Sequence, residues 1–346
     1  GSGGGFDFAT ISAAANAETA GNTYTINVAP GTYTNDFPVI NQPTDIEATG
    51  PGVMLKATAA NDQGIIETFA NLTVNGLTIT GAFTNPGAGD NAAAIRDHNN
   101  GSANANTLIV TNSVIENSQD GIETAGSGNK ENVTIKGTTF LNNGSGNGQT
   151  HALYVGDALS LDVESSLFCG TNNGHDVKSR AATTTVSGST MFVGATGTGC
   201  SSAGTTGIGV DAPNGGVLDL VNDSIIQGPS NSNGALVSYG EEGVLFTTNS
   251  LSAVGTAFST IASGTAIQEL PTCITPAAVQ GGGNTFGAGR IINQPNCLTN
   301  APPPSTPTVP EPGSLGLLGS ALIGMGGAAY RRWWRRCSRP RPPPAE

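Results

Sequence analysis

The feature that most constrains the fold is a unit of two short apolar strands joined by a corner of small residues. It recurs in six segments: LTVNGLTIT (72–80), LIVTNSVIEN (108–117), VTIKGTTFLN (133–142), LDVESSLFCG (161–170), TTVSGSTMFVG (184–194) and LDLVNDSIIQG (218–228). Equivalent aliphatic positions in four of the units are spaced 25, 28 and 23 residues apart: Val110, Ile135, Val163 and Val186. A repeat of that length, with two or three short strands, predicts one turn of a parallel β-solenoid.

A single coil of such a solenoid cannot bury its apolar side chains alone, so the core exists only in the stack. Strands of successive coils lie ~4.8 Å apart, and equivalent inward positions fall on top of one another. The composition agrees, because 50 glycines and few aromatic side chains in 346 residues are typical of an all-β chain with many tight turns. A β-sandwich is the rival architecture, but it requires hairpins between strands of equal length, and the Asn-Gly and Asp-Gly turns here do not join such strands.

The pattern over residues 23–300 resembles the right-handed parallel β-helix superfamily of pectate lyases, polygalacturonases and pectin methylesterases. The resemblance implies an all-β, single-stranded, right-handed parallel β-helix. Residues 1–22 include a stretch of helical character, DFATISAAANAETAG, and are expected to form an N-terminal capping segment. The resemblance concerns architecture and does not assign a reaction.

A third strand is expected in each coil, after the loop that follows the recurring unit. Aligning these segments on an apolar residue superposes Ile95, Ile122, Leu153, Val177, Ile208 and Leu236. Because side chains alternate along a strand, the next residue of each segment points outward. The predicted outward row is Arg96, Glu123, Tyr154, Lys178, Gly209 and Val237. His98 and Arg180 lie two positions beyond this row, and His151 and His175 are expected to stack one coil apart.

These positions collect side chains that are scarce elsewhere in the body of the chain. All three histidines, two of the three arginines before residue 300, and one of the four lysines fall on or beside this one face. Parallel β-helix enzymes hold polysaccharide in a groove along such a face, so the resemblance implies recognition of an anionic polysaccharide here.

Two hypotheses for function follow. The first is a non-catalytic or weakly catalytic surface or matrix protein that binds an acidic extracellular polysaccharide. The second is a polysaccharide lyase that cleaves a uronate-containing glycan by β-elimination. Candidate catalytic residues are Lys178, Arg180, His175, His151 and Tyr154, and candidate substrate-binding residues are Arg96, Glu123 and His98.

In the lyase hypothesis, Arg180 and Arg96 clamp the substrate carboxylate, because a guanidinium binds a carboxylate through two hydrogen bonds. Lys178 or His175 serves as the base that removes the acidified proton. Either Tyr154 or His151 protonates the leaving oxygen, and Glu123 orients a neighbouring cation.

Each of these residues also has a structural interpretation. The two stacked histidines are also consistent with corner residues that bind turn carbonyls. A metal site at this pair is disfavoured, because no Cys or carboxylate stands nearby at ligand spacing. Lys178 and Arg180 are consistent with surface ion pairs to Asp176, Glu123 or Asp211. The Asp sets of polygalacturonases and methylesterases and the acidic calcium cluster of pectate lyases are absent as patterns. No metal ligand is therefore assigned, and a calcium ion is left open as a cofactor.

The five cysteines bear on whether the protein is exported to an oxidising compartment, where disulfides form. Cys169 and Cys200 are 31 residues apart, and Cys273 and Cys297 are 24 apart. Two disulfides in an exported protein would leave Cys337 single, and buried free thiols are the alternative. Spacing alone does not give the pairing.

The C-terminal segment has the features of a signal that directs a protein to its location. A Pro-rich linker (301–308) precedes Val309, Pro310, Glu311 and Pro312, an uncharged apolar stretch from Gly313 to Tyr330, and a cluster that begins with Arg331 and Arg332. Residues 309–337 resemble the PEP-CTERM sorting signal of exopolysaccharide-producing Gram-negative bacteria, although ten residues follow the Arg cluster where most such proteins stop. The apolar stretch is long enough for a short membrane helix, with a plain C-terminal anchor as the alternative. Residues 338–346 are expected to be disordered.

The resemblance implies recognition by an exosortase, transient inner-membrane anchoring, and export to the periplasmic side and then to the cell surface or medium. The chain begins GSGGGFDF without a secretion signal, so we expect a processed or truncated N-terminus. The net charge is −12 although six of the thirteen Lys and Arg residues lie in the tail. A body this acidic lacks the basic footprint of a nucleic-acid partner.

Overall fold

The structure is a computed structural model that describes residues 7–60, 63–85, 92–98, 106–124, 131–269 and 283–293. The chain divides into two units, residues 1–308 and 309–346. The predicted sorting signal, its membrane helix, Cys273 and Cys297 lie outside the described residues. Among the residues that are described, no helix is long and apolar enough to cross a membrane.

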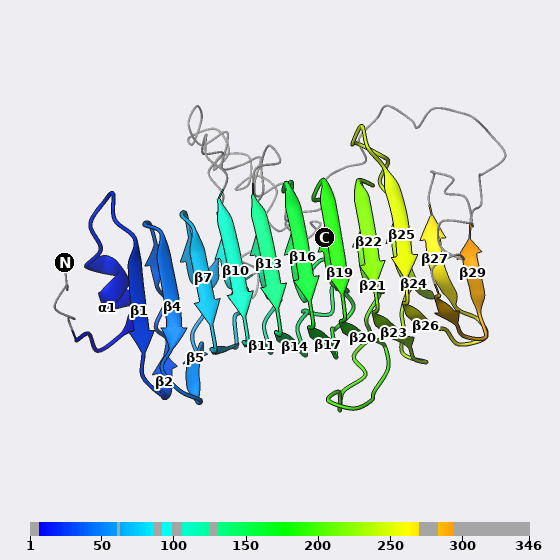
Figure 1. The fold of residues 1–346 in the computed structure, drawn as a ribbon. Helices are drawn as coiled ribbons and strands as arrows, with labels where there is room; N and C mark the ends of the chain where they lie inside the picture. The colour runs from blue at the N-terminus through cyan, green and yellow to red at the C-terminus, as the bar shows by residue number, and fades with distance from the viewer. Residues whose placement is uncertain are drawn as a thin grey trace, which may run out of the picture. The chain divides into compact units, whose positions relative to one another are not determined.

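The first unit is a parallel β-helix of three sheets (Figure 1). Sheet A contains, in spatial order, β1 (Tyr24–Val28), β4 (Thr44–Ala48), β7 (Leu72–Asn75), β10 (Thr107–Thr111), β13 (Asn132–Lys136), β16 (Ser160–Glu164), β19 (Thr183–Ser187), β22 (Val217–Val221) and β25 (Ser250–Val254). Sheet B contains β2 (Gly31–Thr34), β5 (Val53–Lys56), β8 (Thr78–Thr80), β11 (Val114–Glu116), β14 (Thr139–Leu141), β17 (Leu167–Cys169), β20 (Thr190–Val193), β23 (Ser224–Gln227), β26 (Ala257–Ser259) and β28 (Thr285–Phe286). Sheet C contains β3 (Val39–Ile40), β6 (Gly64–Thr68), β9 (Ala93–Asp97), β12 (Asp120–Thr124), β15 (Leu153–Val155), β18 (His175–Ser179), β21 (Ile208–Ala212), β24 (Ala235–Tyr239), β27 (Thr265–Glu269) and β29 (Arg290–Asn293).

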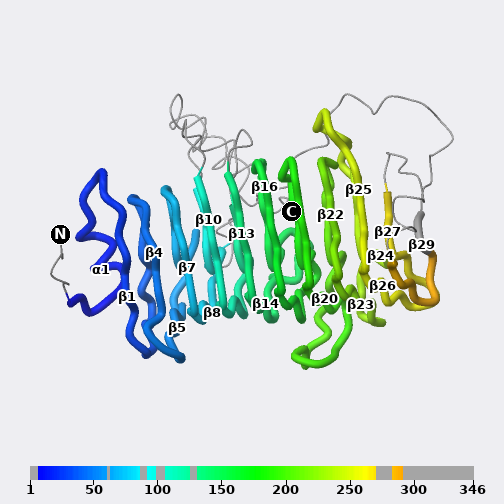
Figure 2. The backbone as a smooth tube through the Cα atoms, viewed as in Figure 1, coloured from blue at the N-terminus to red at the C-terminus, as the bar shows by residue number. Residues whose placement is uncertain are grey.

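Each coil contributes one strand to each sheet in turn, as the path of the backbone in Figure 2 shows. Every strand pair between successive coils is parallel, which confirms the β-helix and excludes the β-sandwich. The four positions aligned from the sequence, Val110, Ile135, Val163 and Val186, pair in one continuous register. All four side chains are buried, so one aliphatic column runs through the core. Phe140 and Phe168 stack beside it with ring centroids 4.6 Å apart.

The corner between sheets A and B is two residues long in most coils, and its sequence explains its shape. The first corner residue adopts positive φ, for example Asn112 (49°) and Gly137 (57°), where Gly and Asn carry little strain. The second residue sends a side-chain oxygen to the preceding coil. Thus Ser189 Oγ accepts the N–H of Ser166 at 3.1 Å, and Asp223 Oδ1 accepts the N–H of Ser189 at 2.8 Å. These hydrogen bonds between corners of successive coils give a partner to backbone N–H groups that do not pair within a sheet.

Sheet C departs from simple alternation, and this corrects part of the predicted alignment. The structure pairs Val177 with Val210, and Val210 with Val237, where the sequence alignment used Ile208 and Leu236. The second residue of these strands points inward, as Gly121 does in β12, and the register follows the third residue, whereas the alignment chose an earlier apolar one. A Cβ on Gly209 would lie 3.0 Å from the core methyl groups of Val193 and Ile225. The true outward residues are therefore Asp211 and Ser238, and the predicted Gly209 and Val237 are wrong.

The first described element is α1 (Ile11–Asn16), which contacts β1 and β3 and buries Ile11 in the core. The side chain of Thr10 accepts the N–H of Ala13 at the start of this helix. The carboxylate of Asp36 accepts the N–H groups of Ile11 (2.7 Å) and Ser12 (3.0 Å). An acidic group at these free amides is stabilising, because the start of a helix carries partial positive charge.

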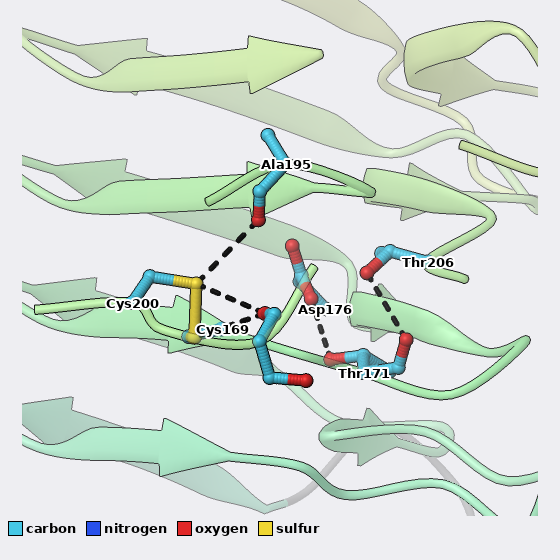
Figure 3. The surroundings of a disulfide bond; sticks show 7 residues. Cys169, Thr171, Asp176, Ala195, Cys200 and Thr206 are labelled. Carbon is cyan, nitrogen blue, oxygen red and sulfur yellow. Dashed lines mark hydrogen bonds between the residues drawn. A yellow bond between two sulfur atoms is a disulfide. The ribbon is translucent and has the colours of Figure 1, made fainter. Parts of the chain in front are cut away.

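A disulfide joins Cys169 and Cys200, with Cα atoms 5.4 Å apart (Figure 3). It ties the loop that follows β20 to the end of β17. The two cysteines pack with Phe192 and Ala195 in a small apolar cluster separate from the main core. Asp176 lies in the same region, where its Oδ1 accepts a hydrogen bond of 2.6 Å from Thr171 Oγ1. The side chain of Asp176 is fully buried, and burial raises its pKa to about 8 against the opposing effect of the Thr171 bond.

We expect Asp176 to make the free energy of unfolding fall as pH rises from about 4 to about 8. In that range the folded protein keeps this proton while the unfolded chain, with an Asp pKa of about 3.9, has lost it. Asp176→Asn removes this one contribution, so the variant should exceed the wild type in Tm by at least about 3 °C at pH 8. The two should converge near pH 4. Thermal melts from pH 4 to pH 9 measure the difference, with the exposed Asp162→Asn as the matched control. Parallel pH profiles for wild type and Asp176→Asn would contradict the expectation.

Candidate functional site

The candidate site is the outer face of sheet C, where residues from successive coils form two rows. The row nearer the strand starts includes Asp120, His151, His175 and Ile208. The second row is Glu67, Arg96, Glu123, Tyr154, Lys178, Asp211 and Ser238, all joined by the strand register. Lys178 is 2% exposed and Asp211 1%. Although these side chains point away from the core, they are shielded from water, which strengthens their electrostatic interactions.

The predicted histidine stack is present. The rings of His151 and His175 lie 4.9 Å apart between centroids and are nearly parallel. The backbone N–H of His175 donates to His151 Nδ1 at 3.1 Å, and the N–H of His151 donates to Asp120 Oδ1 at 2.7 Å. Because Nδ1 of His151 accepts a hydrogen bond, we infer that this imidazole is neutral and carries its proton on Nε2.

Lys178 lies at the centre of the site, between two carboxylates. Its Nζ is 3.8 Å from Asp211 Oδ2 and 3.6 Å from Glu242 Oε1. His175 Nε2 lies 3.7 Å from the same Asp211 oxygen. Burial raises the pKa of Asp211 to about 7, and the positive charge of Lys178 opposes that rise. Asp211 is therefore a group that can exchange a proton near neutral pH.

Arg180 makes the densest set of contacts. Its Nη1 and Nη2 donate to the two carboxylate oxygens of Glu242 at 2.5 and 2.9 Å, a bidentate pair. Nη1 also donates to Asn214 Oδ1 at 2.5 Å, and Nε donates to the hydroxyl of Tyr154 at 3.1 Å. Burial lowers the pKa of Arg180, but its hydrogen bonds to Glu242 and Tyr154, together with the electrostatic attraction of these two groups, outweigh burial and raise the pKa above its ordinary value. Arg180 thus joins β15, β18 and the two loops that follow β21 and β24.

The structure brings together one group of predicted residues and sets another apart. One connected group comes from β15 and β18 and the residues next to them. Its members are His151, Tyr154, His175, Lys178 and Arg180. The predicted substrate-binding residues lie in earlier coils. Arg96 is three coils from Lys178, about 14 Å away at ~4.8 Å per coil.

This second group is made of ion pairs. Arg96 Nη2 donates to Glu123 Oε2 at 2.5 Å, as one of the sequence hypotheses expected. His98 Nε2 lies 2.9 Å from Glu67 Oε2, and its ring stacks on Phe69 at 4.5 Å. Arg96 and Arg180 both contact carboxylates, so neither guanidinium is an open anion clamp in this conformation.

Sequence reasoning named Asp211 only as a surface ion-pair partner of Lys178 or Arg180, whereas the structure buries it in the site, and it missed Glu242 altogether. The register of sheet C places Asp211 beside Lys178, and aligning Val210 with Val177 would have found it. Glu242 lies in a loop without periodicity, and no sequence signal places it on Arg180. Among the described residues, no group of three or more His, Cys, Asp or Glu side chains is arranged to hold a metal ion.

Comparison with known proteins identifies the C-terminal segment. Residues 308–332 match the PEP-CTERM protein-sorting motif, as predicted from Val309 to Arg332. The motif indicates export and processing by an exosortase in bacteria. No curated protein matches the chain.

Two solved structures resemble the chain in fold. A pectin methylesterase in complex with a hexasaccharide has a TM-score of 0.39 at 12% identity, covering 88% of this chain and 96% of its own. The A-module of the mannuronan C-5 epimerase AlgE4 of Azotobacter vinelandii has a TM-score of 0.36 at 12% identity, covering 86% and 95%. At these values neither structure supports an inference about the chemistry of this site.

At pH 8, where the Asp211 carboxyl is mostly ionised, we expect Asp211→Leu to lower the free energy of unfolding by about 3 kcal/mol, because the buried ammonium of Lys178 then loses one of its counter-charges. The double variant Lys178→Met, Asp211→Leu removes both charges and should recover most of the loss. Urea denaturation of the wild type, the two single variants and the double variant measures the coupling as a double-mutant cycle. Additive effects would mean that the two side chains do not stabilise one another.

Proposed function

We propose that this chain is an exported protein whose β-helix binds an acidic extracellular polysaccharide along the outer face of sheet C. Export rests on the sorting motif at residues 308–332. Binding rests on the site geometry: aromatic, cationic and amide side chains from successive coils converge on one face. We further propose that the protein is anchored transiently in the inner membrane and then reaches the cell surface or the medium of a Gram-negative bacterium.

The observation that carries the binding proposal is the set of groups around Arg180. The guanidinium of Arg180 and the ammonium of Lys178 both contact the carboxylate of Glu242. The phenol of Tyr154 and the amide of Asn214 contact the same guanidinium. A uronate residue offers the same carboxylate together with hydroxyl groups for the phenol and amide. Each coil also contributes one outward residue to the second row, at a regular spacing along sheet C. This regular spacing suits a ligand that is itself a chain of repeating units.

The alternative is a lyase, and the hydrogen bond from Arg180 to Tyr154 favours it. In β-elimination a base takes the proton beside the carboxylate, the C–H electron pair forms a carbon–carbon double bond, and the glycosidic oxygen leaves with its bonding pair. Tyr154 would supply the proton for that oxygen. Catalysis is nevertheless the second choice, because the candidate bases are engaged. Lys178 lies between Asp211 and Glu242, and His175 Nε2 lies 3.7 Å from Asp211 Oδ2.

The proposal predicts that the full chain binds pectate, alginate or hyaluronan and not a neutral galactan, without release of unsaturated uronate. His175 has a 16% exposed side chain and lies beside the buried Lys178. We therefore expect His175→Ala to weaken binding about tenfold, equivalent to about 1.4 kcal/mol. Titration calorimetry measures the affinities, and ultraviolet absorbance reports any unsaturated product.

Thr134→Ala, on the outer face of sheet A, is the matched control and should bind like the wild type. Lack of binding to every acidic polysaccharide would refute the proposed function. A rise in absorbance that is lost in Tyr154→Phe would instead establish the lyase.

A further inference from the structure

The loop between β24 and β25, residues 240–249, lies beside the candidate site and is called the strap below. Its backbone is docked on the loop that follows β21. The N–H of Glu242 donates to Pro213 O at 2.9 Å, and the N–H of Leu245 donates to Asn214 O at 3.0 Å. Near its end, Asn249 Oδ1 accepts the N–H of Gly216 at 2.8 Å. The strap is therefore attached by a few hydrogen bonds to another loop, while the side chain of Leu245 is 68% exposed.

One carboxylate of the strap, that of Glu242, contacts the cations of the site. Both oxygens of Glu242 accept hydrogen bonds from Arg180, and one lies 3.6 Å from Lys178 Nζ. The cations belong to β18 and its end, whereas the anion belongs to the strap. The side chain of Glu242 is 24% exposed, against 11% for Arg180 and 3% for Lys178. Glu242 is thus the most exposed member of this cluster, and the two cations lie deeper.

A carboxylate from an acidic sugar can make the same contacts as Glu242. It has the same charge and the same pair of oxygens for the guanidinium fork, so exchanging one for the other costs little in electrostatic energy. Removing the Glu242 carboxylate without a replacement would be unfavourable, because the partly buried Arg180 and Lys178 would lose a counter-charge. The closed position of the strap is therefore favoured until another anion takes the place of Glu242.

We propose that Glu242 is an internal ligand of the Arg180–Lys178 subsite, and that the carboxylate of a uronate residue displaces it and releases the strap. This inference rests on the proposed function and adds how the site is regulated and which sugar group it takes. The carboxylate of Glu242 is tethered beside the two cations and competes with the carboxylate of the uronate for them. The strap therefore raises the ligand concentration that is needed for binding. A closed population of about 90% would weaken the apparent affinity about tenfold.

The test is Glu242→Gln in the full chain, with Glu241→Gln as the matched control. Glu241 is the adjacent carboxylate on the same strap, and it accepts a hydrogen bond from Ser238 Oγ at 3.3 Å. The probes are oligogalacturonate and oligomannuronate, with a neutral galactan oligosaccharide of similar length for comparison. We expect Glu242→Gln to bind an acidic probe about tenfold more tightly than the wild type. Glu241→Gln should gain at most about twofold from the change in overall charge, and the neutral probe should not change in affinity.

Hydrogen exchange provides a second readout on the wild type. The amides of Glu242 and Leu245 are protected by Pro213 O and Asn214 O, and an acidic probe should accelerate their exchange as the strap is released. A fall or no change in their exchange rates at saturating probe would overturn the proposal. This measurement does not depend on the stability of any variant.

The outcomes separate this proposal from the proposed function. If wild type and Glu242→Gln bind an acidic probe equally, the internal-ligand proposal fails and polysaccharide binding stands. If Glu241→Gln gains as much as Glu242→Gln, the gain is a general charge effect and the proposal also fails. If no variant binds any probe, both proposals fail.

Discussion

The parallel pairing of each coil with the next is the interaction on which the rest of the structure depends. It aligns residues 20 to 36 positions apart, so that aliphatic side chains form continuous columns in the core. The same register aligns the outward residues. A site therefore arises on this fold without any local motif, because Tyr154, Lys178 and Asp211 become neighbours only through the pairing of β15, β18 and β21.

Burial decides the character of that site. The outer face of sheet C is chemically polar yet shielded, and isolated charges in such a place would be costly. The cations accordingly carry counter-charges from the chain itself: Arg96 pairs with Glu123, and Arg180 pairs with Glu242. The predicted concentration of cations on one face is real, but their charge is largely neutralised. Any anionic ligand must replace one of the chain's own carboxylates.

The core and the site differed in how far they could be predicted. Val110, Ile135, Val163 and Val186 align correctly because an inward aliphatic column must recur in every coil, and the chain displays it as a pattern. In sheet C two consecutive inward residues recur from coil to coil, and the prediction failed after β18 because it aligned Ile208 and Leu236 instead of Val210 and Val237. That choice replaced Asp211 by Gly209 in the predicted row. Glu242 was out of reach for another reason: loops obey no period, and their contacts are set by where they fold back.

By itself the sequence determined the all-β winding, the aliphatic columns, the histidine stack and the sorting motif at its C-terminus, because each depends on periodicity or on a contiguous run of residues. Only the tertiary structure decided which carboxylate faces which cation. Those pairings join residues 27 to 64 positions apart, from Arg96 with Glu123 to Lys178 with Glu242. They depend on the register of sheet C and on the course of its loops, and neither of these appears as a periodic pattern in the sequence.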